Sequence, residues 1–163
     1  SKLKKIKKLN PITTKKQYEI LYQLFVKLKK NNINPIYGKF NKKKNRIMEP
    51  LLYENAPINS QLYKKELFGP IIVLDFFDNY DEAIKLANNT QYGLSAMIWS
   101  KNIIKAEKII NEVNAGRIWI NGTITQNYPF IPIGGFKESG IGRETGEEGI
   151  KTYSQIKSII INK

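Results

Sequence analysis

Hydrophobic positions near the front of the chain follow a helical spacing. Apolar residues recur every three or four positions, at Tyr18, Leu21, Leu24, Phe25 and Leu28. This spacing gathers them on one face of a helix. Thr14, with Gln17 three residues later, has the form of a capping box, which marks a helix N-terminus. The pattern predicts an amphipathic helix that begins after Thr14 and ends near Asn31.

The next segments favour strands. Short extended pieces are expected at 35–37 and 50–53, on either side of a polar turn at 42–45. The apolar run 70–77 is rich in β-branched and aromatic residues. Such a run is typical of a strand that is covered on both faces.

Beyond this run the alternation becomes regular. Asn79 followed by Glu82 predicts the start of one helix, and a second helix is expected from about Ile104 to Ala115. The strands that these helices separate are expected at 70–77, 96–99 and 118–120. Strands and helices that alternate with short connections are typical of parallel βαβ units, so we predict an α/β fold.

The composition limits the class of protein and the catalytic groups that it can contain. Of 163 residues, 41% are hydrophobic and 25% charged, as in a globular domain with a real core. No apolar run is long enough for a membrane span, and the start of the chain lacks the apolar stretch of a secretory signal. The chain has no cysteine and no histidine, which excludes disulfides, a cysteine nucleophile and a histidine base. We expect a cytoplasmic protein without a metal site.

The net charge of +13 has two interpretations. Lysines gather at 4–8, 15–16, 29–30 and 42–44, and a basic surface can bind phosphates. The abundance of Lys, Asn, Ile and Tyr is also what a compositional bias produces, and no nucleic-acid motif accompanies the lysines. We favour the compositional interpretation and expect neither a nucleic-acid partner nor a membrane partner.

Two segments are candidates for binding. Gly69 and Pro70 predict a tight turn that holds Glu66 and Phe68 at the entrance of a strand. There a carboxylate can accept hydrogen bonds from a diol and an aromatic ring can pack on another ring, although a surface Glu and a core Phe fit equally well. The loop 121–130 follows a predicted parallel strand, where such folds place binding sites.

The glycine-rich stretch 132–146 is not a phosphate-binding loop. It lacks the last glycine of the dinucleotide fingerprint, follows no predicted strand and contains no Gly-Lys-Ser. Its glycines indicate unusual backbone angles or close approach of another group. The apolar segment 155–162 at the end of the chain predicts a strand, which either closes the chain's own sheet or pairs with a partner's edge.

Six segments, taken in order, resemble the C-terminal region of aldehyde dehydrogenases. They lie at 66–70, 81–88, 92–94, 115–121, 132–137 and 139–144. The match runs from about residue 10 to the end of the chain. The resemblance implies a soluble NAD- or NADP-dependent oxidoreductase that converts an aldehyde to a carboxylic acid. It also implies that a cysteine thiolate attacks the carbonyl and a glutamate activates water, and that both lie upstream of this region.

The resemblance assigns a cofactor role to two residues. Glu66 corresponds to the residue that hydrogen-bonds the nicotinamide ribose, and Phe68 to the aromatic residue beside the nicotinamide. Gln17 falls where some members contact the adenine ribose, but its capping role explains it adequately.

The substrate side is assigned in the same way. The aldehyde pocket wall corresponds to Thr123, Tyr128, Phe130 and Ile133. Ile133 stands where an aromatic residue is more usual. Glu144 matches a glutamate implicated in a proton path to the active site.

The resemblance also implies an organisation. Residues 1–153 correspond to the C-terminal portion of the catalytic domain, whose parallel βαβ layers are incomplete in this chain, and 154–163 to an oligomerisation strand. We therefore expect a fragment that is inactive alone and that pairs with a second copy or with a missing N-terminal segment. The alternatives are a non-catalytic partner of intact aldehyde dehydrogenase subunits and, less favoured, a basic nucleic-acid binder.

Overall fold

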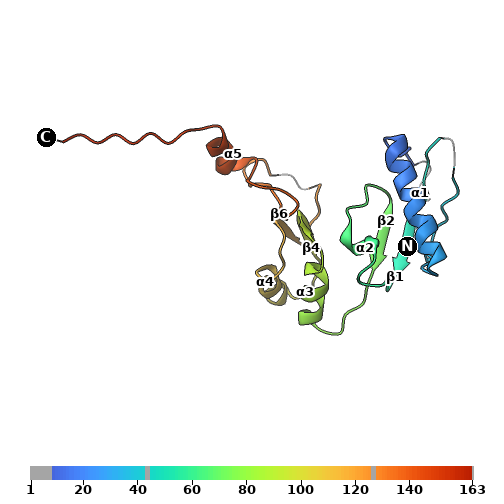
Figure 1. Ribbon diagram of the computed structural model, residues 1–163. Helices are drawn as coiled ribbons and strands as arrows, with labels where there is room; N and C mark the ends of the chain where they lie inside the picture. Colours follow the sequence, from blue (N-terminus) through green and yellow to red (C-terminus); the bar gives the residue numbers. More distant parts are fainter. Residues whose placement is uncertain (1–8, 43–44, 126–127, 163) are drawn as a thin grey trace. The chain divides into compact units, whose positions relative to one another are not determined.

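The chain forms two compact units, Ser1–Phe77 and Asp78–Lys163. Figure 1 shows the computed structural model, which describes residues 9–42, 45–125 and 128–162. The lysines at 4–8 and at 43–44 lie outside the described residues.

The first unit begins with the predicted helix. α1 spans Lys15–Lys30, and its N-cap residue Thr14 accepts a hydrogen bond from the Gln17 amide at 3.1 Å. The helix ends at Asn31, as predicted. The Gln17 side chain does not complete a capping box. It donates to the Phe68 carbonyl oxygen at 3.4 Å, because that carbonyl lies beside the first turn of the helix.

A short parallel pair of strands packs with this helix. β1 is Leu51–Glu54, α2 is Gln61–Lys64 and β2 is Ile71–Leu74. The two strands run parallel, with Leu51 opposite Ile71 and Glu54 opposite Leu74. One face of α1 and the residues it packs against form the core: Tyr18, Leu21, Leu24, Leu28, Phe40, Met48, Leu51, Tyr53, Ala56 and Leu62.

One expectation for the apolar run 70–77 is wrong within this chain. β2 is only four residues long, and the side chains of Ile72 and Leu74 are 62% and 40% exposed. Ile71 and Val73 pack against the core on one face of β2, whereas the face that carries Ile72 and Leu74 is left exposed.

The second unit contains the predicted βαβ alternation. Its elements are α3 (Tyr80–Asn88), β3 (Tyr92–Gly93), β4 (Ser95–Ile98), α4 (Ile103–Ile110), β5 (Arg117–Ile120), β6 (Phe136–Lys137) and α5 (Gly146–Thr152). β4 and β5 are parallel and joined through α4, which confirms an α/β fold. β3 and β6 form a second, antiparallel pair.

The predicted start of α3 is confirmed, whereas the predicted end of α4 is wrong. Asn79 caps α3 by accepting from the Glu82 amide at 2.9 Å, as predicted. α4 ends at Ile110, short of the predicted Ala115, since the chain turns back to enter β5 and the Asn114 amide donates to the Asn88 side chain at 2.8 Å.

The end of the chain does not form the predicted strand within this structure. Residues 155–162 run away from α5 with no assigned secondary structure (Figure 1), and Ile156 and Ile160 are 100% and 85% exposed. A strand requires the backbone of a neighbour, and none of the three sheets in the described chain receives this segment.

No helix in the described part of the chain is long and apolar enough to cross a membrane.

Candidate functional site

The predicted cofactor residues lie in the first unit, on the turn between α2 and β2. Glu66 is exposed, and the Phe68 side chain is 70% exposed. The turn lies close against α1, because a Cβ added at Gly69 would lie 2.6 Å from Leu21 Cδ1. Together with the bond from Gln17 to the Phe68 carbonyl oxygen, this contact fixes the turn and leaves both side chains accessible.

A tyrosine and a carboxylate hold the two ends of this turn. Tyr63 on α2 donates its hydroxyl to Asp75 Oδ1, just after β2, at 2.6 Å. Burial, followed by the hydrogen bond and the charge of Asp75, raises the pKa of Tyr63. The bond from Tyr63 to Asp75 anchors the segment between α2 and β2 at both sides.

The other predicted site residues lie in the second unit. The loop after β5 starts at Asn121, which has a φ of 51°. Its side chain accepts from the Ser100 amide and donates to the Ser100 carbonyl oxygen, each at 2.9 Å. The side-chain oxygens of Thr123 and Thr125 are 2.6 Å apart. Asn121 therefore ties the start of the loop to the residue that follows β4 by two positions.

Farther along this loop two aromatic rings are in contact. The rings of Tyr128 and Phe130 lie 6.0 Å apart at 56°, and both side chains are exposed. Residues 126–127, which belong to the predicted loop, lie outside the described part of the chain.

The pocket residue Ile133 pairs directly with Glu144. Each donates its amide to the carbonyl oxygen of the other, at 2.8 Å from Ile133 and 2.7 Å from Glu144. A broad hollow beside this pair is lined by Phe130, Ile133 and Glu144, among others. The structure thus gathers three of the predicted residues around one hollow, whereas Thr123 and Tyr128 do not line it.

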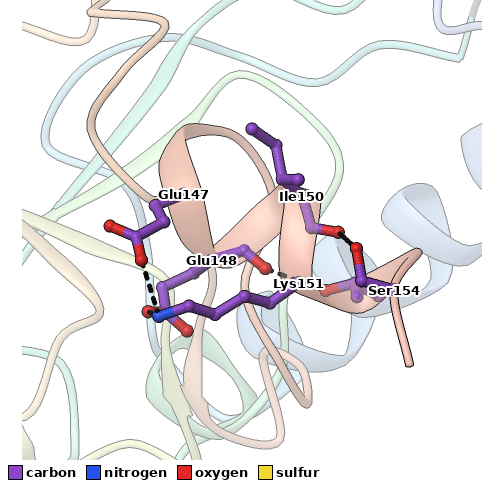
Figure 2. Close-up of polar contacts among 6 residues, drawn as sticks. Glu147, Glu148, Ile150, Lys151 and Ser154 are labelled. Atoms are coloured by element: carbon purple, nitrogen blue, oxygen red, sulfur yellow. Dashed lines mark hydrogen bonds and ion pairs between the residues drawn. The ribbon is translucent and has the colours of Figure 1, made fainter. Parts of the chain in front are cut away.

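Helix α5 forms another side of the same hollow through Ile150. Figure 2 shows how its polar side chains are held: Lys151 contacts Glu147 at 3.1 Å and Glu148 at 2.8 Å. The hydrogen bond to Glu148, and then the one to Glu147, raises the pKa of Lys151. The Ser154 hydroxyl donates to the Ile150 carbonyl oxygen at 3.0 Å (Figure 2).

The sequence interpretation missed two residues that bond the segment next to the hollow, Arg117 and Thr145. Arg117 donates through Nη2 to the carbonyl oxygens of Ile131 and Pro132, at 2.8 and 3.1 Å. The Thr145 hydroxyl donates to the same Ile131 oxygen at 2.7 Å. An arginine at the start of a predicted strand was the available signal for Arg117, but its partners lie 14 and 15 residues away, beyond any local pattern.

No cluster of three or more Asp or Glu side chains that could hold a metal ion occurs among the described residues.

The geometry has counterparts in known proteins. Residues 1–159 match the model of the aldehyde dehydrogenase family. The chain belongs to that family. Over 119 residues it is 43% identical to aldehyde dehydrogenase (NAD(P)+) 2 of Saccharomyces cerevisiae, which covers 73% of this chain and 23% of the relative. Over 155 residues it is 35% identical to the chloroplastic betaine aldehyde dehydrogenase of Amaranthus hypochondriacus, which covers 93% and 31%.

Solved aldehyde dehydrogenases share the fold. The NAD+ complex of the Bacillus cereus aldehyde dehydrogenase matches with a TM-score of 0.85 and 34% identity, over 93% of this chain and 31% of that one. The chain thus spans about a quarter to a third of the length of these relatives. Family membership confirms the resemblance, and the roles of individual residues stay predictions.

Proposed function

We propose that this chain supplies part of the cofactor and aldehyde sites of an NAD(P)-dependent aldehyde dehydrogenase, an oxidoreductase that converts an aldehyde to a carboxylic acid. The observation that carries the proposal is the pairing of Ile133 with Glu144 at one hollow, within a chain that matches the family over residues 1–159.

The cofactor side of the proposal concerns Glu66 and Phe68. The exposed Glu66 carboxylate can accept hydrogen bonds from both hydroxyls of a ribose. The Phe68 ring, 70% exposed, offers an aromatic face to the nicotinamide. A nicotinamide held here would supply the hydride acceptor, and Glu66 and Phe68 would orient it.

The substrate side concerns the second unit. We assign the aldehyde pocket wall to Thr123, Tyr128, Phe130 and Ile133. The two aromatic rings and the isoleucine offer an apolar surface to the aldehyde's substituent. Glu144, which shares the hollow with Phe130 and Ile133, has a carboxylate that can accept and release a proton, and we assign it to the proton path.

The nucleophile must come from other sequence. The 163 residues contain no cysteine, so no thiolate of this chain can attack the aldehyde carbon. We expect no aldehyde oxidation from the chain alone. A cysteine and a water-activating glutamate must reach the aldehyde from a separate or preceding segment.

The end of the chain carries the assembly role. We assign 1–153 to the catalytic domain and 154–163 to a strand that pairs with a second subunit. The exposure of Ile156 and Ile160 supports this assignment, because an apolar segment without a partner strand is unfavourable in water. A cytoplasmic location stays a prediction, which imaging of a tagged chain would check.

The function is tested by assaying NADH production with an aliphatic aldehyde. We expect the purified chain alone to produce no NADH. Mixed with the remaining part of the yeast relative, which supplies the missing region, it is expected to restore turnover. In that mixture Glu66→Ala should raise the KM for NAD+ about tenfold through loss of a charged hydrogen bond. Glu54→Ala removes an exposed carboxylate on β1 and serves as the control.

Two results would contradict the proposal. NADH production by the lone chain would show that it does not need an external cysteine. An active mixture in which Glu66→Ala and Glu54→Ala have equal KM values for NAD+ would remove Glu66 from the cofactor site.

A second function is favoured by the free terminal segment alone. A non-catalytic partner would bind intact aldehyde dehydrogenase subunits through residues 154–163 without contributing to turnover. Co-purification with full-length subunits, together with unchanged turnover of those subunits, is the result that this alternative predicts.

A further inference from the structure

The starting observation is a strained backbone at Thr145. This β-branched residue has a φ of 58° and a ψ of 167°, a region that side chains other than glycine rarely adopt. Such a conformation is unfavourable and persists only where the surroundings enforce it. It is located between Glu144 and the first residue of α5.

Four hydrogen bonds enforce this conformation. The Thr145 hydroxyl donates to the Ile131 carbonyl oxygen at 2.7 Å. On one side Glu144 exchanges backbone bonds with Ile133, and on the other the Gly146 amide donates to the Pro129 carbonyl oxygen at 3.1 Å. Thr145 therefore lies at the centre of the hydrogen bonds that join the segment 144–146 to the segment 129–133.

Arg117 completes the arrangement from the sheet. Its Nη2 donates to the carbonyl oxygens of Ile131 and Pro132, and its guanidinium lies 5.7 Å from the Trp119 ring centre. A hydrogen bond from a charged donor is stronger than one from a neutral donor. The Ile131 carbonyl oxygen thus accepts two hydrogen bonds, one from Arg117 on β5 and one from Thr145.

We propose that Thr145 and Arg117 are positioning residues that clamp the Ile131 carbonyl and so hold the pocket wall at Phe130 and Ile133 in register with Glu144. This inference rests on the proposed function, which assigns Phe130 and Ile133 to the pocket wall and Glu144 to the proton path. The clamp holds both in place. Neither residue contacts the aldehyde in this proposal. Their effect is on the distance and orientation between the wall and the Glu144 carboxylate.

The decisive variants differ by one hydroxyl. Thr145→Val keeps the β-branched shape and removes the donor, whereas Thr145→Ser keeps the donor. Arg117→Met removes the charged donor from the sheet side. The matched control is Ser100→Ala, which removes another hydroxyl-to-carbonyl bond, from Ser100 to Asn102 at 3.1 Å, without touching the clamp.

The first measurement uses the reconstituted enzyme described above. Thr145→Val and Arg117→Met are expected to raise the aldehyde KM about tenfold, the effect of one lost hydrogen bond, with the KM for NAD+ unchanged. Thr145→Ser and Ser100→Ala should keep the wild-type aldehyde KM. A purely structural role would instead lower the melting temperature and change both KM values together, and that result would overturn the proposal.

The second measurement needs no activity. Hydrogen exchange of the Ile133, Glu144 and Gly146 amides is followed in the full 163-residue chain. Exchange is expected to accelerate about tenfold in Thr145→Val and to stay unchanged in Thr145→Ser. Equal exchange in wild type and Thr145→Val would overturn the clamp. If the wild-type mixture never oxidises an aldehyde, the proposed function is wrong. The exchange rates still show whether the Thr145 hydroxyl holds the two segments together.

Discussion

The carbonyl oxygen of Gly134 occupies the space that a side chain at Gly116 would need. A Cβ built on Gly116 would lie 1.6 Å from that oxygen. Gly116 directly precedes β5, and its amide donates to the Gly93 carbonyl oxygen at 3.0 Å. The glycine therefore allows the glycine-rich stretch to lie directly against the start of β5.

Replacing Gly116 with alanine is expected to destabilise the second unit strongly. The overlap is with backbone, so β5 and the stretch around Gly134 must separate, at a cost of about 3 kcal/mol. Urea unfolding followed by tryptophan fluorescence measures this loss, because both tryptophans of the chain, Trp99 and Trp119, lie in the second unit.

Gly142→Ala is the comparison for this substitution. Gly142 has a φ of 79° and no neighbour within 4 Å of an added Cβ. Only the left-handed backbone disfavours a side chain there, at roughly 1–2 kcal/mol. Equal losses in the two variants would show that the contact between Gly116 and Gly134 is not tight.

Thr14 is expected to stabilise the first unit as the N-cap of α1. Thr14→Ala removes the acceptor for the Gln17 amide and should cost about 1 kcal/mol. The adjacent Thr13 is exposed and precedes the cap, so Thr13→Ala is the matched control. Thermal unfolding followed by circular dichroism at 222 nm compares the two, and a lower melting temperature for Thr13→Ala than for Thr14→Ala would contradict the capping role.

The structure confirms the two predicted N-cap residues, although the Gln17 side chain does not make the return bond of a capping box. Thr14 and Asn79 were recognised as caps because a cap and its acceptor site are three residues apart. α5 was missed, since Gly146 and Gly149 are poor helix formers and its start depends on contacts with the loop before it.

The sequence did not predict features that depend on residues far apart in the chain. The exposure of Ile72 was not predicted, because the apolar sequence of the strand does not show whether anything packs on its second face. Arg117 and Thr145 meet at the Ile131 carbonyl oxygen from positions 14 residues away on either side. No periodic pattern marks such a convergence, so only the structure could reveal it.

Tyr53 is expected to make the first unit sensitive to alkali. The side chain is 1% exposed, and its hydroxyl has no hydrogen-bond partner among the described residues. Burial raises the pKa of Tyr53 from 10.0 to about 12. Between these values the unfolded chain loses the proton and the folded chain keeps it, so the free energy of unfolding falls as the pH rises from 10 to 12.

Tyr53→Phe should remove this loss, which is of the order of 2 kcal/mol. At neutral pH the variant should be at least as stable as wild type, because a buried hydroxyl without a partner is removed. Tyr37→Phe, at an exposed tyrosine, is the control. Urea unfolding at pH 7, 10 and 12 gives the three curves, and parallel pH dependences of Tyr53→Phe and wild type would contradict the assignment.

The terminal segment provides the last prediction, which concerns assembly. If residues 155–162 pair with a strand of a second subunit, a charge at Ile160 must be buried against that subunit or the pairing must be lost. Ile160→Lys is therefore expected to shift the chain from oligomer to monomer in light scattering coupled to size exclusion. Thr13→Lys adds the same charge at an exposed residue of the first unit, outside the segment, and should leave the oligomer intact. A wild-type chain that is monomeric at all concentrations, or an oligomer that survives Ile160→Lys, would show that this segment does not pair as proposed.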